Sequence, residues 1–336
     1  MHFDLTDDQR SIQRTARDFL AARYKPEEIR RLAYETERGF TDESWADICE
    51  LGWPALLVDE EHGGLGLGVV ELAVVQEELG AALAPSPFLS SVAAAALIAD
   101  AGSDEQRARW LPGLAAGDAR GTVASLRDGA GWAAVPDADG ADVVVLRDGD
   151  GWALAEGVTV APVRALDPTR RLWNVTADRA LDPLRGDGAR AADVIAVALA
   201  AESVGVALRT LEMAVAYAKE REQFGRPIGA YQAVSHACAQ MLLEVEGARS
   251  VVLYAAWALD HEEIASPPAP LAASMAKAYA SDAGWRVPAA ALQVHGGIGF
   301  TWEHDLHLWL KRGKANAYLW GDAREHRARV ADLIGL

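Results

Sequence analysis

Two segments of the sequence carry residues whose types and spacing suit a phosphate-containing ligand. Arg221 opens the run Arg-Glu-Gln-Phe-Gly-Arg-Pro-Ile, and Gln293 opens the run Gln-Val-His-Gly-Gly-Ile-Gly-Phe. A guanidinium offers a planar fork of donors to phosphate oxygens, and paired glycines let backbone approach a ligand without a Cβ clash. Taken singly, Arg221 also fits an ordinary surface charge, and Gly296-Gly297 also fits a helix C-cap. The two runs together form a long composite signature that chance is not expected to produce.

Titratable side chains outside these segments offer weaker candidates. Glu303, His304 and Asp305 are consecutive, and consecutive residues at a helix start point to different faces, so a joint acid-base or metal site is not expected. An acidic cap on the helix that follows is the better interpretation. His236, and His295 within the second segment, are interpreted as histidines with satisfied hydrogen bonds.

The composition indicates a globular chain with a poor electrostatic match to nucleic acid. The 336 residues are 51% hydrophobic and 24% charged, enough to bury a sizeable core in two or three domains. A formal net charge of −17 opposes phosphate backbones, so nucleic acid is not an expected partner. A polyanionic small ligand would need a local basic patch, and the candidates for one are Arg221, Arg226, Lys311, Arg312 and Lys314.

The N-terminus gives the cytoplasm as the default location, and the cysteines indicate no metal site. Met1-His2-Phe3-Asp4-Leu5 lacks a basic-then-apolar signal pattern, and no stretch of about eighteen uncharged apolar residues suits a bilayer. Cys49 and Cys238 are far apart and lack metal-ligand spacing, so both are interpreted as small buried side chains, and no metal site is expected.

Helix signals dominate the first third of the chain. Thr6 followed by Gln9, and Ser103 followed by Gln106, fit the capping box and predict helix starts. A glycine-rich stretch, 63–68, has neither the preceding strand nor the spacing of a dinucleotide fingerprint, so a loop or helix-entry turn is predicted there.

The pattern changes to short strands from Gly121 and returns to helices near residue 188. Strands are expected at 132–135, 142–146, 152–155 and 158–160, with a hairpin turn at 147–151. Alanine-rich helices are then expected at 191–220, 230–259, 271–294 and 306–319. The predicted fold is mostly α with a small central β domain. Its domains are a helical one at 1–120, a truncated β one at 121–187 and a helical bundle at 188–336.

The two glycine- and arginine-containing segments, in this order of elements, resemble the acyl-CoA dehydrogenase family over essentially the full chain. The resemblance implies an FAD shared at a subunit interface and an oxidoreductase acting on acyl-CoA. In the family, one subunit's C-terminal helices reach the pyrophosphate and adenosine of its neighbour's flavin. The positions that match those contacts are Arg221, Phe224, Gln232, Gln293, Gly296 and Gly297.

The same resemblance exposes a missing catalytic base. Dehydrogenation α,β to a thioester needs a carboxylate for the α-proton while the β-hydride goes to flavin. The two family locations for that carboxylate match Trp320 and Ile195, and neither is acidic. Asp322, Asp193 and Glu202 lie nearby, but two positions on a helix turn a side chain by about 200°, so solvated or capping roles are expected.

The flavin-ring wall is reduced as well. Family members carry a stretch like Thr-Glu-Pro-x-Ala-Gly-Ser-Asp and a later Trp-Ile-Thr, whereas residues 123–130 read Val-Ala-Ser-Leu-Arg-Asp-Gly-Ala and no Trp-Ile-Thr occurs. The chain is similar to the smaller, non-catalytic subunit of actinobacterial heteromeric dehydrogenases of steroid side-chain β-oxidation. That similarity implies a two-plus-two heterotetramer with a second dehydrogenase subunit, an acyl-CoA substrate, and an electron-transfer flavoprotein or similar acceptor.

Three other functions stay open at the level of sequence. A self-sufficient homomeric dehydrogenase could use Asp322 as a displaced base. A flavin-free scaffold or acyl-CoA-binding protein would need neither base nor cofactor. A flavin monooxygenase with this fold would need no base for an α-proton.

Overall fold

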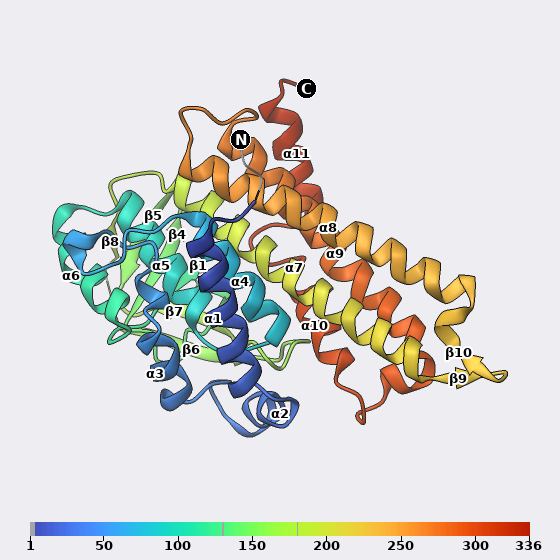
Figure 1. Ribbon diagram of the computed structural model, residues 1–336. Coiled ribbons are helices and arrows are strands. Elements are labelled where there is room, and N and C mark those ends of the chain that lie inside the picture. Colours follow the sequence, from blue (N-terminus) through green and yellow to red (C-terminus); the bar gives the residue numbers. More distant parts are fainter. Residues whose placement is uncertain (1–3, 130, 180) are drawn as a thin grey trace. The chain divides into compact units, whose positions relative to one another are not determined.

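The computed structural model describes residues 4–129, 131–179 and 181–336, which divide into two compact units. The helical unit comprises Met1–Pro26, Ala73–Ala84 and Ala196–Leu336. The mixed unit comprises Glu27–Leu72 and Pro85–Ile195. The chain is mostly helical with a small β region, as the sequence predicts (Figure 1).

The mixed unit combines short helices with two four-stranded sheets. Its helices are α2 (Pro26–Glu35), α3 (Asp42–Glu50), α5 (Phe88–Ala101) and α6 (Asp104–Ala116). The predicted capping box at Ser103 and Gln106 is confirmed, because each side chain bonds the other's backbone N–H. The glycine-rich stretch 63–68 is a loop that leads into α4 (Val69–Ala82), as expected.

Both sheets lie between residues 121 and 183. One has the order β1-β4-β5-β8, from β1 (Gly121–Ala124), β4 (Val143–Asp148), β5 (Gly151–Ala155) and β8 (Asp182–Pro183). The other has the order β2-β3-β7-β6, from β2 (Arg127–Asp128), β3 (Gly131–Pro136), β7 (Leu172–Ala177) and β6 (Val158–Val163). The predicted hairpin turn joins β4 to β5, and Trp132, Val144, Leu146 and Val175 share one apolar core.

The helical unit is built on three long helices that run alongside one another (Figure 1). These are α7 (Ala189–Glu220), α8 (Gln232–Asp260) and α9 (Ala269–His295), followed by α10 (Leu306–Asn316) and α11 (Ala323–Leu333). Helix α1 (Asp7–Arg23) starts at the predicted capping box of Thr6 and Gln9. The predicted helix 306–319 is too long by three residues, because the chain turns after Asn316.

Glycines allow the helices of this unit to cross with their backbones in contact. A Cβ on Gly80 of α4 would lie 2.2 Å from the Glu202 carbonyl oxygen, and one on Gly205 of α7 would lie 1.9 Å from the Glu77 carbonyl oxygen. A Cβ on Gly313 of α10 would likewise lie 1.9 Å from the carbonyl oxygen of Gly284 on α9. No side chain fits at such distances, so these crossings depend on glycine.

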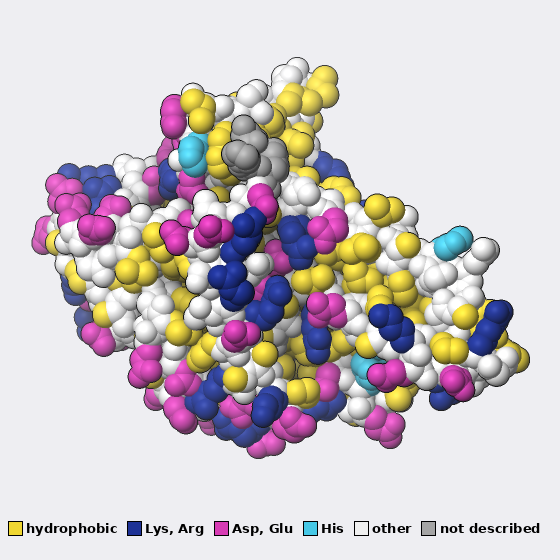
Figure 2. All heavy atoms as spheres, viewed as in Figure 1, with side chains coloured by type: hydrophobic (Ala, Val, Ile, Leu, Met, Phe, Trp, Pro, Cys, Tyr) yellow, Lys and Arg dark blue, Asp and Glu magenta, His cyan; other side chains and the backbone are white. Residues whose placement is uncertain are grey.

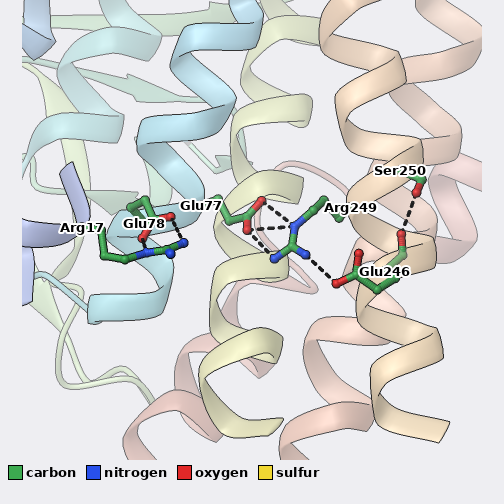
Figure 3. A network of polar contacts seen from close by, with 6 residues as sticks. All are labelled: Arg17, Glu77, Glu78, Glu246, Arg249 and Ser250. Atoms are coloured by element: carbon green, nitrogen blue, oxygen red, sulfur yellow. Dashed lines mark hydrogen bonds and ion pairs between the residues drawn. The ribbon is translucent and has the colours of Figure 1, made fainter. Parts of the chain in front are cut away.

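Buried charges accompany the crossings and are paired. On α4, Glu78 accepts from Arg17 of α1 at 2.7 Å, while Glu77 accepts from Arg249 of α8 at 2.7 Å (Figure 3). Arg249 also bonds Glu246, so one guanidinium joins two carboxylates. Charged groups this deep in protein require partners to offset their desolvation.

Helix α7 is long and apolar enough to cross a bilayer by length and composition. However, 89% of its most apolar window is buried by the rest of the protein. Its hydrophobicity is therefore that of a core helix, which passes the same test as a membrane span.

The pair between Glu202 and Arg312, both 3% exposed and joined at 2.5 Å, gives a test of the bundle. We expect Arg312→Met to lower the free energy of unfolding by about 3–5 kcal/mol, because it leaves a buried carboxylate without this cation. Arg31→Met is the control, since Arg31 pairs with Glu28 on the exposed surface of α2 and should contribute at most about 1 kcal/mol. Urea denaturation measures both, and equal losses would contradict this account.

Candidate functional site

The predicted ligand-contacting residues all lie at one end of the helical unit. Helix α8 runs antiparallel to α7 and to α9, so the last residues of α7 and α9 and the first of α8 share an end, which the hairpin of β9 (Glu222–Gln223) and β10 (Arg226–Pro227) marks (Figure 1). We call residues 217–232 and 293–305 the bundle end. The six predicted contact residues, Arg221, Phe224, Gln232, Gln293, Gly296 and Gly297, are among its exposed residues.

The hairpin presents Phe224 outward on strained backbone. Phe224 (φ 53°) and Gly225 (φ 78°) form a two-residue loop with both residues in the left-handed region, the geometry of a type I′ turn. A left-handed conformation costs a residue such as phenylalanine about 1–2 kcal/mol, yet the side chain is 94% exposed and gains little from burial. An exposed, strained aromatic is a reason to suspect a binding role.

Hydrogen bonds and a cation–π contact stabilise the hairpin that exposes Phe224. The Arg221 carbonyl accepts from Ile228 N at 2.8 Å, and Tyr231 Oη donates to the Gln223 carbonyl at 3.2 Å. The Arg226 guanidinium lies 4.1 Å from the centre of the Tyr231 ring, a cation–π contact. The hairpin is thus supported by the side chain of Tyr231, the residue that precedes α8.

The end of α9 offers bare backbone. Gly296 has φ 64° and ψ −142°, a conformation essentially restricted to glycine. No heavy atom of the described residues lies within 4 Å of a Cβ placed on Gly296 or Gly297, whereas one on Gly299 would meet His295 at 3.1 Å. The first two glycines therefore face open space that a ligand can approach.

The position expected to carry a base lies in a turn. We call residues 316–322, between α10 and α11, the corner. Within it Trp320 has φ 63° and Gly321 has φ 90°, so the helical geometry assumed for this stretch is wrong. The Trp320 carbonyl accepts from His326 Nε2 at 3.0 Å. The alternative base position, Ile195, is 4% exposed on α7.

Lys277, which the sequence reasoning missed, donates hydrogen bonds to backbone carbonyls of the corner. Its Nζ donates to the carbonyls of Asn316 (3.1 Å) and Gly321 (2.9 Å) and to Ser281 Oγ (3.0 Å). The side chain is 1% exposed, and this burial lowers the pKa of its ammonium to about 8. A lysine on an alanine-rich helix face was the only signal in the sequence.

The nearby acids are committed to structural contacts. Asp322 accepts from the backbone N–H of Arg324 (2.9 Å) and Glu325 (2.8 Å) as the N-cap of α11. The hydrogen bond from Glu325 N is the main reason why the pKa of Asp322 is lowered, which makes it a weaker base. Glu202 is paired with Arg312, and Asp193 is 2% exposed.

The proposed basic patch does not form as a surface. Arg312 is buried against Glu202, so its inclusion was wrong. Lys311 lies over the Trp302 ring, and Lys314 lies over the rings of Trp285 and Tyr318. These ammonium groups contact aromatic faces.

The cysteines and acidic side chains give no sign of metal chemistry. Cys49 and Cys238 are free, and burial raises the pKa of the Cys49 thiol to about 11 and also raises that of Cys238. Among residues 4–129, 131–179 and 181–336, no three His, Cys, Asp or Glu side chains cluster as a metal site would require. Asp305 occupies the N-cap position of α10, but its side chain makes no capping hydrogen bond; Leu306 N donates to His304 Nδ1 instead, so the acidic-cap interpretation holds only for position.

Comparisons with known proteins identify the family. Residues 6–118 match the acyl-CoA dehydrogenase N-terminal domain, and residues 190–334 match the acyl-CoA dehydrogenase C-terminal domain. Acyl-CoA dehydrogenase IpdE2 of Mycolicibacterium smegmatis is 37% identical over 327 residues, covering 97% of this chain and 98% of the relative. Acyl-CoA dehydrogenase FadE34 of Mycobacterium tuberculosis is 35% identical over 88% of this chain and 43% of its own length.

Solved structures agree with the sequence relatives. The ChsE4-ChsE5 complex from Mycobacterium tuberculosis includes a chain with a TM-score of 0.90 and 26% identity, covering all of both chains. The Tcur3481-Tcur3483 steroid ACAD G363A variant gives a TM-score of 0.87 at 29% identity, covering 98% of each chain. The chain belongs to the acyl-CoA dehydrogenase family, whose members are FAD-dependent oxidoreductases acting on acyl-CoA.

Lys277 gives a pH-dependent test of the corner. Its pKa is about 8 in the folded state against 10.5 for an unperturbed lysine. Between these values the folded protein releases a proton that the unfolded chain keeps, so stability rises with pH across this window. We expect Lys277→Met to lower the free energy of unfolding by about 1–3 kcal/mol, because two carbonyls lose their donor.

The difference between the wild type and Lys277→Met should grow from pH 8 to pH 10.5, as measured by urea denaturation at several pH values. A matched substitution of exposed Lys219 to Met should leave the pH profile unchanged. A difference that is flat across the window would contradict the assignment.

Proposed function

We propose that this chain is one subunit of a heteromeric FAD-dependent acyl-CoA dehydrogenase. It contributes contacts to the adenosine and pyrophosphate of the flavin, while a second dehydrogenase subunit supplies the ring pocket and the catalytic base. The observation that carries the proposal is a contrast. The bundle end keeps exposed residues suited to the nucleotide, whereas the two base positions hold Trp320 and Ile195.

The chemistry of the bundle end fits the nucleotide half of FAD. The Arg221 guanidinium suits a pyrophosphate, and the Gln232 and Gln293 carboxamides can donate to or accept from the adenosine. Gly296 and Gly297 leave backbone uncovered, as a close approach of the cofactor requires. These groups are exposed in the single chain, which is what a cofactor shared between subunits needs.

Proton removal is the step this chain lacks. When bound, FAD supplies the acceptor for the β-hydride, and a carboxylate must take the α-proton. Asp322 is the nearest acid to the expected position, but its oxygens cap α11 and its pKa is lowered. The self-sufficient homomeric alternative therefore has no suitable base at the corner, and the partner must provide one.

The β region supports the same division of labour. The two sheets between residues 121 and 183 include strands of only two to six residues. A small β region leaves room for a bulky acyl chain, and one structural relative, the Tcur3481-Tcur3483 variant, is a steroid ACAD. A steroid side-chain CoA is thus the substrate we favour.

The helical unit has an exposed apolar surface that a partner subunit could cover. Figure 2 shows hydrophobic side chains gathered over α7 and α8. An open groove there, of about 660 Å³, is lined mainly by apolar residues, among them Leu208, Leu211, Val215 and Leu242. We propose that this surface is a subunit contact in a two-plus-two heterotetramer. The cytoplasm, and an electron-transfer flavoprotein or similar acceptor, are proposed from the family resemblance.

Replacing Arg221 tests the proposal. We expect Arg221→Ala, co-purified with the proposed partner subunit, to keep the assembly but to bind FAD on the order of tenfold or more weakly, since it loses a charge-assisted bond to phosphate. Flavin absorbance after gel filtration measures the bound FAD. The control is Arg209→Ala, which removes an exposed arginine of α7 that pairs with Glu212. Unchanged FAD content in Arg221→Ala would contradict the proposed role.

A further inference from the structure

Three rings in contact, one pair stacked and one pair edge-on, connect the two halves of the bundle end. The His295 ring lies parallel to the Tyr217 ring, with centroids 4.6 Å apart and planes at 22°. The His304 ring meets His295 edge-on, also at 4.6 Å, with planes at 61°. Tyr217 belongs to α7, His295 ends α9 and His304 lies in the segment before α10, so three parts of the chain meet in one stack.

The stacked residues are adjacent along the chain to residues assigned to the cofactor. The Tyr217 carbonyl accepts from Arg221 N at 2.8 Å, which fixes the last turn of α7 before the hairpin. On the other side, His295 is followed at once by Gly296 and Gly297. The face-to-face contact of Tyr217 with His295 therefore joins the turn that leads to Arg221 to the residue that precedes the two glycines.

Hydrogen bonds fix the tautomers of both histidines. His295 Nδ1 donates to the Ala291 carbonyl at 2.8 Å, so the proton is on Nδ1. His304 Nδ1 accepts from Leu306 N at 3.1 Å, so its proton is on Nε2. Burial lowers the pKa of both rings, which keeps them neutral and able to stack near neutral pH.

His295 retains a cost that a simple packing residue would avoid. It is 4% exposed, and its Nε2 has no hydrogen-bond partner among the described residues. A buried acceptor without a partner costs about 1–3 kcal/mol, and a phenyl ring would stack without it. Its Nδ1–H, in contrast, satisfies the Ala291 carbonyl in the last turn of α9.

We propose that His295 is a positioning residue for FAD binding, and that its stack with Tyr217 and His304 keeps Arg221 in register with Gly296 and Gly297. This inference rests on the proposed function of the bundle end. Contact between the Tyr217 and His295 rings sets where the Gly296–Gly297 backbone lies relative to α7. The Nδ1–H of His295 fixes the orientation of its own ring.

Paired substitutions separate the ring from its hydrogen bond. His295→Ala removes the ring, whereas His295→Phe keeps a planar ring and loses the donor. From the α7 side, Tyr217→Ala removes the ring and Tyr217→Phe keeps it. In the heteromer, we expect each alanine variant to bind FAD on the order of tenfold more weakly and each phenylalanine variant to stay within about threefold of the wild type.

Flavin titration of the reconstituted apo-heteromer measures the affinity, and gel filtration with far-ultraviolet circular dichroism measures assembly and helix content. Wild-type FAD affinity in either alanine variant would overturn the proposal. Equal losses in His295→Phe and His295→Ala would also overturn it, by assigning the effect to the hydrogen bond. Loss of assembly together with FAD in the alanine variants would make the stack a folding element and would likewise contradict it.

Arg221→Ala in the same titration distinguishes the two levels of inference. If Arg221→Ala also binds FAD normally, the cofactor role of the bundle end is wrong. If Arg221→Ala loses FAD and His295→Ala does not, only the positioning role fails.

Discussion

The close crossing of α4 and α7 is the constraint on which the helical unit depends. Gly80 and Gly205 let the two backbones touch, and any side chain at either position would overlap a carbonyl group of the other helix. Because the contact is backbone to backbone, it fixes where α7 lies along α4 more tightly than interdigitating side chains would. Paired charges on the same helices, Glu77 with Arg249 and Glu202 with Arg312, then attach α8 and α10.

Helix α7, whose position is fixed by this crossing, extends to the bundle end. Its last turn holds Tyr217 and leads into the hairpin with Arg221, and α9 follows through the stacked His295 ring. The exposed residues at that end are thus placed by buried contacts several turns away. A preformed edge of this kind lowers the ordering cost of binding a large cofactor.

Local signals in the sequence predicted much of the fold. The capping boxes at Thr6 and Ser103 and the hairpin between β4 and β5 depend on residues within a few positions of one another, and each prediction is confirmed. Strand β1 was missed because its four residues pair with β4, about twenty positions later, in a parallel register that no local pattern reveals. Lys277 was missed for the same reason, since its acceptors Asn316 and Gly321 lie far along the chain.

The sequence named candidate contact residues, and their role toward FAD stays a prediction, but it did not give the geometry of the site. Sequence reasoning named Trp320 as the position of an absent base, yet a helix was assumed where Lys277 and His326 hold a turn with a left-handed tryptophan. Nothing in the sequence indicated that Phe224 would adopt a left-handed conformation while almost fully exposed. Both residues have side chains that ordinarily avoid that region. The two-residue hairpin turn sets the backbone of Phe224, whereas contacts from Lys277 and His326 hold that of Trp320.

The claim that this chain holds part of a flavin without completing an active site is tested most directly by counting flavin. The chain purified alone, and the chain purified with its proposed partner dehydrogenase subunit, would each be assayed for FAD per polypeptide and for oxidation of acyl-CoA. The account predicts neither FAD nor activity in the chain alone, and one FAD per pair of unlike subunits in an active complex. A full complement of FAD with acyl-CoA oxidation by the chain alone would contradict it.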